Sequence, residues 1–194
     1  RGLLSVVLGA EEIRFRILEK AIRWDRLIFA YEGVTPIGFV AFQIYGSGPY
    51  MPRLKQFCDE FGCSSGFWRF CLFWAIEYRS LFTPFYLYGL KVNVLARRKG
   101  IGSALIQMAE EEALRRGLHN IVLEVNSTND PAKYMYKQRG YSIKKRINLR
   151  WAARFFSFSG VFVLQKKLKP EFNLKDYSKL MRVLDYFLYP IYAI

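Results

Sequence analysis

The stretch from Phe85 to Tyr141 constrains the fold more than any other part of the sequence. Residues Phe85–Leu95 have the β-branched and aromatic character of a strand, and the turn Arg97–Gly102 follows with two glycines one residue apart. A helix to about Arg116 and a second strand over Asn120–Val125 are expected next. Glycines between a strand and a helix start let backbone N–H groups approach a ligand, and the positive end of the helix dipole favours phosphate there. The pattern therefore predicts either a phosphate-binding turn or a tight strand-to-helix connection.

The rest of the chain adds elements on both sides of this stretch. Strands on both sides of two helices predict an α/β (α+β) fold with a mixed sheet, in a single domain over residues 1–194. The expected elements are a helix over Gly9–Trp24, a hairpin of Leu27–Tyr31 and Pro36–Tyr45, a short helix ending at Gly140, strands Tyr141–Leu149 and Gly160–Lys167, and a final amphipathic helix over Leu174–Leu188, within about residues 173–189.

An apolar and aromatic insertion occupies about residues 50–84. Its composition predicts helices around Arg53–Phe61 and Phe67–Leu81. Its longest uncharged piece, Ser80–Leu90, is far shorter than the roughly 20 residues that a membrane-spanning helix needs, so we expect no transmembrane span. The insertion either covers a small apolar pocket or packs as a second core layer, and we favour packing.

Basic residues are concentrated in the second part of the chain. The formal net charge is +14, and residues 85–194 carry 20 Lys and Arg against 8 Asp and Glu, whereas residues 1–84 carry 10 against 8. This asymmetry favours a polyanionic ligand at the glycine turn. No stacking motif for single strands and no recognition-helix pattern is evident, which argues against nucleic acid.

The three cysteines predict no metal site. Cys58, Cys63 and Cys71 form neither an even set nor a CxxC spacing, and no histidine lies nearby in the sequence. We interpret them as free or buried thiols in a reducing compartment. Because no signal peptide is visible either, a cytoplasmic location is expected.

Two sequence blocks together resemble the GCN5-related N-acetyltransferase (GNAT) family. The family's acetyl-CoA loop has the form Q/R-x-x-G-x-G/A, which Arg97, Gly100 and Gly102 match after a strand and before a helix. Leu105 stands where a dinucleotide fingerprint needs its third glycine. The family's second block, N-x-x-A followed by hydrophobic-Tyr-x-x-x-Gly-aromatic, is matched by Asn129, Ala132, Met135, Tyr136, Gly140 and Tyr141.

The resemblance implies a mostly antiparallel central sheet flanked by helices, with a splayed strand pair that holds acyl-CoA. Acetyl-CoA is then the co-substrate, and no metal is required. By this correspondence, backbone groups of Val92 and Val94 line the pantetheine arm, and Asn129 hydrogen-bonds it. The loop that binds the pyrophosphate is Arg97, Arg98, Lys99, Gly100, Ile101, Gly102 and Ser103. Apart from the resemblance, the helix itself has Ile101, Leu105 and Met108 on one face, and Glu110–Glu112 are expected to be exposed.

The resemblance also assigns a catalytic acid and leaves the base open. Tyr136 matches the family's general acid, which protonates the departing thiolate. Glu124 lies on a Leu-Glu-Val strand that resembles the one carrying the base in ribosomal-protein alanine N-terminal acetyltransferases, but an exposed strand carboxylate is an equally good interpretation. Asn93 cannot act as a base, and His119 is expected to be inert. Asp130 is expected to cap the following helix, with Pro131 at its first position.

The predicted function is transfer of an acetyl group from acetyl-CoA to a primary amine of a small molecule, peptide or protein, by direct attack in a ternary complex. The alternative is a non-catalytic module that binds CoA, a membrane surface or nucleic acid through its basic part. The intact turn together with Tyr136 favours the enzyme, because a binding module has little need of the tyrosine. The expected assembly is a monomer or a homodimer.

Overall fold

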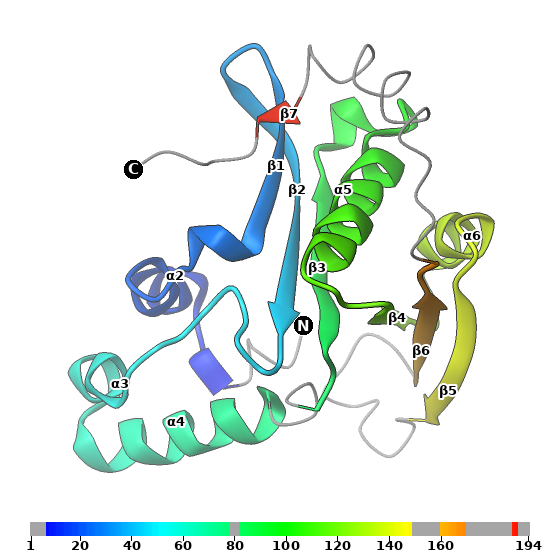
Figure 1. Cartoon of the computed structure of the whole chain (residues 1–194). Coiled ribbons are helices and arrows are strands. Elements are labelled where there is room, and N and C mark those ends of the chain that lie inside the picture. Colours follow the sequence, from blue (N-terminus) through cyan, green and yellow to red (C-terminus); the bar gives the residue numbers. More distant parts are fainter. Residues whose placement is uncertain (1–6, 78–81, 149–159, 170–187, 190–194) are drawn as a thin grey trace.

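A seven-stranded sheet organises the residues that the computed structural model describes, which are 7–77, 82–148, 160–169 and 188–189 (Figure 1). The strands are β1 (Leu27–Glu32), β2 (Thr35–Ile44), β3 (Phe85–Val92), β4 (Asn120–Asn126), β5 (Ser142–Asn148), β6 (Gly160–Lys167) and β7 (Leu188–Tyr189). Their order is β5-β6-β4-β3-β2-β1-β7, and among these strands only β3 and β4 pair in parallel. The mixed, mostly antiparallel sheet predicted from the sequence is confirmed.

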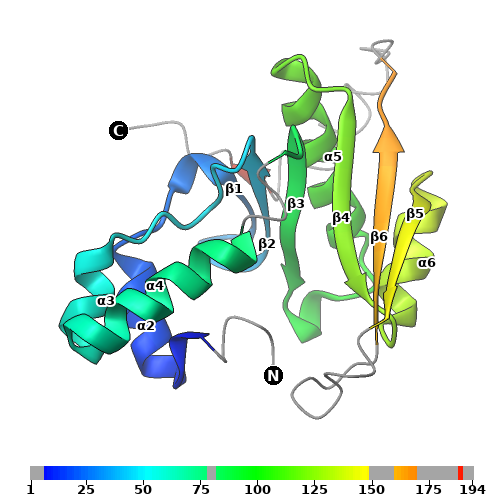
Figure 2. The same cartoon turned by 90° about the horizontal axis from the view of Figure 1, so that it is seen from below.

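Two groups of helices flank this sheet. The helices are α2 (Glu11–Glu19), α3 (Leu54–Phe61), α4 (Cys63–Glu77), α5 (Ile101–Arg115) and α6 (Asp130–Gln138), with 3₁₀ turns η1 (Trp24–Arg26) and η3 (Val94–Ala96). Figure 2 shows α2, α3 and α4 grouped together, apart from α5 and α6. This separation corresponds to two hydrophobic clusters.

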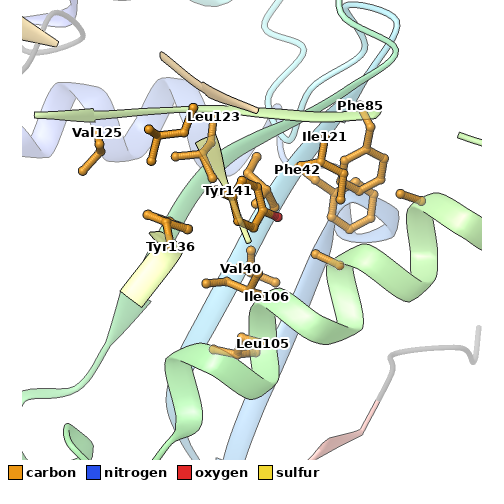
Figure 3. Packing of buried hydrophobic residues seen from close by; sticks show 14 of the residues in the cluster. Val40, Phe42, Phe85, Leu105, Ile106, Ile121, Leu123, Val125, Tyr136 and Tyr141 are labelled. Carbon is orange, nitrogen blue, oxygen red and sulfur yellow. The ribbon is translucent and has the colours of Figure 1, made fainter. Parts of the chain in front are cut away.

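The larger cluster lies between the sheet and helices α5 and α6 (Figure 3). Leu105 and Ile106 of α5 are fully buried, and Tyr136 of α6 belongs to the same cluster. From β4, Leu123 and Val125 join it. Because side chains alternate along a strand, these residues define the face of the sheet that α5 and α6 cover.

The smaller cluster joins the insertion to the first helix. Phe57 of α3, Phe73 of α4 and Ile17 of α2 are all at most 1% exposed and pack together. Packing as a second core layer is therefore what the insertion does. Helix α4 begins at Cys63, earlier than the predicted Phe67, because the corner after α3 is tight. A Cβ on Gly66 would lie 2.7 Å from the backbone of Phe57, so only glycine fits there.

The predictions of one strand and one helix needed correction. Strand β3 ends at Val92 and not at Leu95, because the Asn93 side chain accepts a hydrogen bond from the Leu95 amide (3.2 Å) and holds the 3₁₀ turn η3. The final helix was predicted over Leu174–Leu188, within about residues 173–189, and its positions up to 187 lie outside the described residues. At the end of this range, Leu188 and Tyr189 form strand β7, which pairs with Phe29 and Ala30 of β1, so the helix prediction is wrong there.

Candidate functional site

Strands β3 and β4 separate after three parallel pairs. The last of these pairs is Leu87 with Leu123, although β3 continues to pair with β2 as far as Val92. The register between β2 and β3 also skips Tyr88 at this point. An extra residue of this kind is a β-bulge, which bends its strand and increases the local twist. The bulge thus turns β3 away from β4, and the predicted splayed strand pair is confirmed.

The glycine turn lies at the open end of this splay. Gly100 has φ +80° and is the N-cap of α5, and the Ala104 amide is the donor to its carbonyl oxygen (3.0 Å). The amides of Ile101, Gly102 and Ser103 therefore belong to the first helical turn, where no carbonyl four residues earlier is available. These N–H groups, at the positive end of the helix dipole, form an arrangement that suits a phosphate.

The basic side chains of the turn surround these amides. Arg97, Arg98 and Lys99 are all exposed, and Arg98 has φ +63°, an unusual conformation for a residue other than glycine. Arg97 donates from Nε to the Val92 carbonyl oxygen (3.2 Å), and Lys99 Nζ lies 4.0 Å from Glu32 Oε1. Val94, expected at the strand end, lies in η3 with 68% of its surface exposed.

Gly102 links the turn to α6. A Cβ on this glycine would lie 3.4 Å from Met135 Sδ and within 3.8 Å of Leu90 and Val92 side-chain atoms. The start of α5, the end of β3 and helix α6 therefore meet at one point. Met135 immediately precedes Tyr136, so the two sequence blocks are also neighbours in space.

Helix α6 begins one residue earlier than its capping pattern suggests. Asn129 is the N-cap, and its Oδ1 accepts a hydrogen bond from the Ala132 amide (3.2 Å). The prediction that Asp130 caps the helix was wrong, because Asn and Asp are comparable caps and only the backbone decides between neighbours. Asp130 instead pairs with Lys133 (2.6 Å). The Asn129 side-chain NH₂ is not used in the cap.

Tyr136 is a buried, protonated phenol. It is 7% exposed, its ring centroid lies 5.5 Å from that of Tyr141, and burial raises its pKa to about 12. At neutral pH the hydroxyl therefore holds its proton and can act as a donor. Tyr134 of the same helix is 67% exposed and lies outside the buried cluster.

Glu124 lies on the other face of the sheet. Its neighbours Leu123 and Val125 enter the cluster under α5 and α6, so the side chain of Glu124 points away from them. Glu124 is half-buried and is the first residue of β4 beyond the last pair with β3. The predicted acid and the predicted base thus lie on opposite faces of the sheet.

Comparison with a sequence model of a protein family provides evidence that does not depend on this geometry. The model for the acetyltransferase (GNAT) family matches residues 9–141. The chain belongs to the GNAT family.

The chain is similar in fold to solved structures of acetyltransferases. A protein described as a putative streptothricin acetyltransferase from Bacillus anthracis, in complex with acetyl coenzyme A, is 16% identical with a TM-score of 0.50, covering 73% of this chain and 61% of that one. A ribosomal-protein-alanine N-acetyltransferase from Brucella melitensis is 15% identical, with a TM-score of 0.49 and coverages of 73% and 68%. No curated protein matches the chain in sequence. Within the described residues, no helix has the length and apolar character to cross a membrane.

Two features of this GNAT domain were not predicted from the sequence. Glu110 was expected to be exposed, but it is 4% exposed, and its Oε2 accepts from Arg139 Nη2 (3.1 Å) and Lys166 Nζ (2.8 Å). The error arose because α5 is covered on this side by the α6–β5 junction and β6. Burial, together with the Glu110 carboxylate, raises the pKa of Tyr141 far above its ordinary value.

The second feature is a tyrosine–carboxylate pair at the bulge. Tyr88 donates from its hydroxyl to Glu77 Oε1 (2.8 Å), and the two residues come from β3 and the insertion. Burial, and then the Glu77 carboxylate, raise the pKa of Tyr88 well above its ordinary value. Neither residue belongs to a motif, so nothing in the sequence connected them.

Proposed function

We propose that this GNAT domain is an N-acetyltransferase that moves an acetyl group from acetyl-CoA to a primary amine. Family membership already implies acetyl-CoA-dependent acetyl transfer. The observation that supports the finer proposal is that β3 and β4 separate after Leu87 in a sheet that has Tyr136 on one face and Glu124 on the other. A thioester held in this gap has a proton donor on one face and a proton acceptor on the other.

CoA would bind along the open edge of β3 and across the glycine turn. The pyrophosphate lies on the first amides of α5, and the basic side chains of the turn balance its charge. The pantetheine arm follows the backbone near Val92, and the Arg97 side chain then leaves the Val92 carbonyl oxygen to make room for it. The side-chain NH₂ group of Asn129 donates a hydrogen bond to the pantetheine arm. The residues we propose for CoA are Val92, Val94, Arg97, Arg98, Lys99, Gly100, Ile101, Gly102, Ser103 and Asn129.

Acetyl transfer then needs no covalent intermediate. The free amine attacks the thioester carbonyl, the C–N bond forms, the C–S bond breaks, and Tyr136 gives its proton to the departing thiolate. A phenol with a pKa of about 12 is a weak acid, but the same dry surroundings also raise the pKa of the leaving thiol. Glu124, directly or through water, accepts the proton that the amine loses.

The compartment proposed from the sequence is the cytoplasm. Cys58, Cys63 and Cys71 are free in the structure, as suits a reducing environment. The acceptor amine belongs to a small molecule, peptide or protein.

The test is an acceptor screen with acetyl-CoA that measures thiol release. We expect turnover with at least one class of primary amine, and we expect Tyr136→Phe to lower kcat by about 100-fold while the KM for acetyl-CoA changes less than about twofold. Tyr134→Phe is the matched control on the exposed side of α6 and should leave kcat unchanged. CoA binding without turnover on any amine would favour a non-catalytic module.

A further inference from the structure

The C-terminal end of α6 forms a Schellman motif around Gly140. This glycine has φ +81°, its amide donates to the Lys137 carbonyl oxygen (3.0 Å), and the Tyr141 amide donates to the Tyr136 carbonyl oxygen (3.0 Å). These two hydrogen bonds and the left-handed glycine define the motif, which is often accompanied by an apolar contact across the turn. The residues that such a contact joins here are Tyr136 and Tyr141.

The rings of Tyr136 and Tyr141 make this contact. Their centroids lie 5.5 Å apart at an interplanar angle of 68°, which is the edge-to-face arrangement that aromatic pairs favour. The two side chains are 7% and 4% exposed and belong to the larger hydrophobic cluster (Figure 3). The position of the Tyr136 ring therefore depends on the side chain at residue 141.

A group of charged side chains, the Glu110 cluster of Glu110, Arg139 and Lys166, lies beside Tyr141. Glu110 Oε2 accepts hydrogen bonds from Arg139 Nη2 (3.1 Å) and Lys166 Nζ (2.8 Å), and Lys166 Nζ lies 5.6 Å from the centroid of the Tyr141 ring. Burial and then the Glu110 carboxylate raise the pKa of the Tyr141 hydroxyl, although no hydrogen bond of ordinary geometry joins this hydroxyl to another described residue. Tyr141 is thus held by its ring contact and by its charged neighbours.

Helix α6 is attached to α5 at two points, one on each side of Tyr136 in the sequence. At the first point, a Cβ on Gly102 would lie 3.4 Å from Met135 Sδ, and at the second point Glu110 binds Arg139. A helix attached at two points cannot turn about either one alone. The helix that begins at the glycine turn therefore also fixes the orientation of the helix that carries Tyr136.

We propose that Tyr141 is a positioning residue, which holds the Tyr136 hydroxyl in the orientation from which it protonates the departing thiolate. The Schellman motif places the Tyr141 ring against Tyr136, and the Glu110 cluster keeps that ring in place. The proton that is transferred belongs to Tyr136, and Tyr141 neither gains nor loses one. This inference rests on the proposed function, because it concerns the acid of acetyl transfer.

A double-mutant cycle tests whether Tyr141 acts through Tyr136. The substrates are acetyl-CoA and the primary amine that gives the fastest thiol release in the acceptor screen. Tyr141→Leu should lower kcat about 10-fold and change the KM for acetyl-CoA less than about twofold, because a displaced acid loses much of its effect. In the Tyr136→Phe background the same substitution should change kcat less than about twofold. Tyr141→Phe retains the ring and should retain most of the wild-type kcat.

Two glycines allow a milder perturbation that leaves the core side chains unchanged. Gly140→Ala strains the left-handed residue of the Schellman motif, and its Cβ would meet only Lys166 Cε, at 4.0 Å. Gly117, with φ +71°, ends α5 in the same way, because the amides of Gly117 and Leu118 donate to carbonyl oxygens of the last turn (both 2.8 Å). Gly140→Ala should lower kcat about threefold, and Gly117→Ala is the matched control that should leave it unchanged. Gly140→Ala completes the same cycle if Tyr141→Leu does not fold.

Nuclear magnetic resonance of the protein with isotope-labelled tyrosine needs no acceptor. The ring signals of Tyr136 are assigned by their absence in Tyr136→Phe. In Tyr141→Leu these signals should move towards those of exposed tyrosines, because the ring loses the neighbour that packs against it. They should stay in place in Tyr134→Leu, which removes an exposed ring from the same helix.

The outcomes distinguish this inference from the function on which it rests. Unchanged Tyr136 signals in Tyr141→Leu, or a kcat loss of the same size with and without the Tyr136 hydroxyl, would overturn the positioning role and leave the proposed function intact. Wild-type kcat in Tyr136→Phe would instead contradict the proposed acid, and the absence of turnover on any primary amine would contradict the proposed function itself.

Discussion

The helices on the two sides of this molecule differ in how strongly the sequence constrains them. The α5–α6 layer contains both family blocks, and Ile101, Met135 and Tyr136 from these blocks pack in the larger hydrophobic cluster. The α2–α4 layer contains no recognised motif, has its own small aromatic core, and exposes Trp68 by 70% and Phe67 by 48% on α4. The two family blocks are therefore confined to the first layer, although the family model matches residues 9–141 and so extends over both layers.

The largest expected difference concerns ion pairs. Glu110→Ala in α5 should lower the free energy of unfolding by about 3–5 kcal/mol, because it leaves Arg139 and Lys166 without their buried counter-charge. Glu60→Ala, which removes the exposed pair with Arg16 in the α2–α4 layer, should change stability little. Urea unfolding of both variants measures this. Equal effects would show that the Glu110 cluster is not a special feature of the α5–α6 layer.

Two left-handed glycines provide the next comparison. Gly100, with φ +80°, and Gly62, with φ +76°, both have open space where a Cβ would stand, so a side chain strains both backbones alike. Gly100→Glu should weaken CoA binding by about 100-fold, since a carboxylate then occupies the phosphate position. Gly62→Glu, at the α3–α4 corner, should not affect CoA affinity. Calorimetry with CoA that finds the two variants alike would remove the turn from the binding site.

A pH-dependent difference is expected from Tyr136. Burial raises the pKa of Tyr136 from 10.0 to about 12. Between pH 10 and pH 12, the hydroxyl therefore keeps its proton in the folded state and loses it in the unfolded state. The contribution of Tyr136 to the free energy of unfolding is fully present below pH 10, and it decreases by up to about 2.7 kcal/mol as the pH rises to 12. Thermal unfolding between pH 9 and 12 should show a shallower decline for Tyr136→Phe than for wild type. Parallel curves would place Tyr136 in a more solvated position.

The smallest effect is expected on the outer face of α4. Trp68→Ser removes an aromatic side chain that is largely exposed, so stability should change by no more than about 0.5 kcal/mol and CoA affinity should be unchanged. Phe73 lies on the buried face of the same helix and is 1% exposed, so Phe73→Ala should lower the free energy of unfolding by about 3–5 kcal/mol. Denaturant titration of the pair tests whether α4 has one structural face and one free face.

Much of the fold was predictable because its causes are local. Strand β6 was predicted at Gly160–Lys167 and lies there, and the β1–β2 hairpin was predicted from the β-branched and aromatic residues on both sides of the turn at Gly33. The glycine turn and Tyr136 were found from motif spacing. The α6 cap was misplaced by one residue, and Glu110 was expected at the surface, because neither local pattern contains information about the neighbouring elements.

Sequence alone indicated most of the helices and strands and the family to which the chain belongs, since periodicity, turn residues and motif spacing depend on residues close together in the chain. Only the tertiary structure decided that Tyr88 is skipped in the register of β3, that Glu77 meets it from a separate helix, and that β7 pairs with β1. These contacts join segments that are distant in sequence, so their energies depend on packing that no single segment specifies. The glycine turn and the family could therefore be predicted from the chain, and the contact between Tyr88 and Glu77 could not.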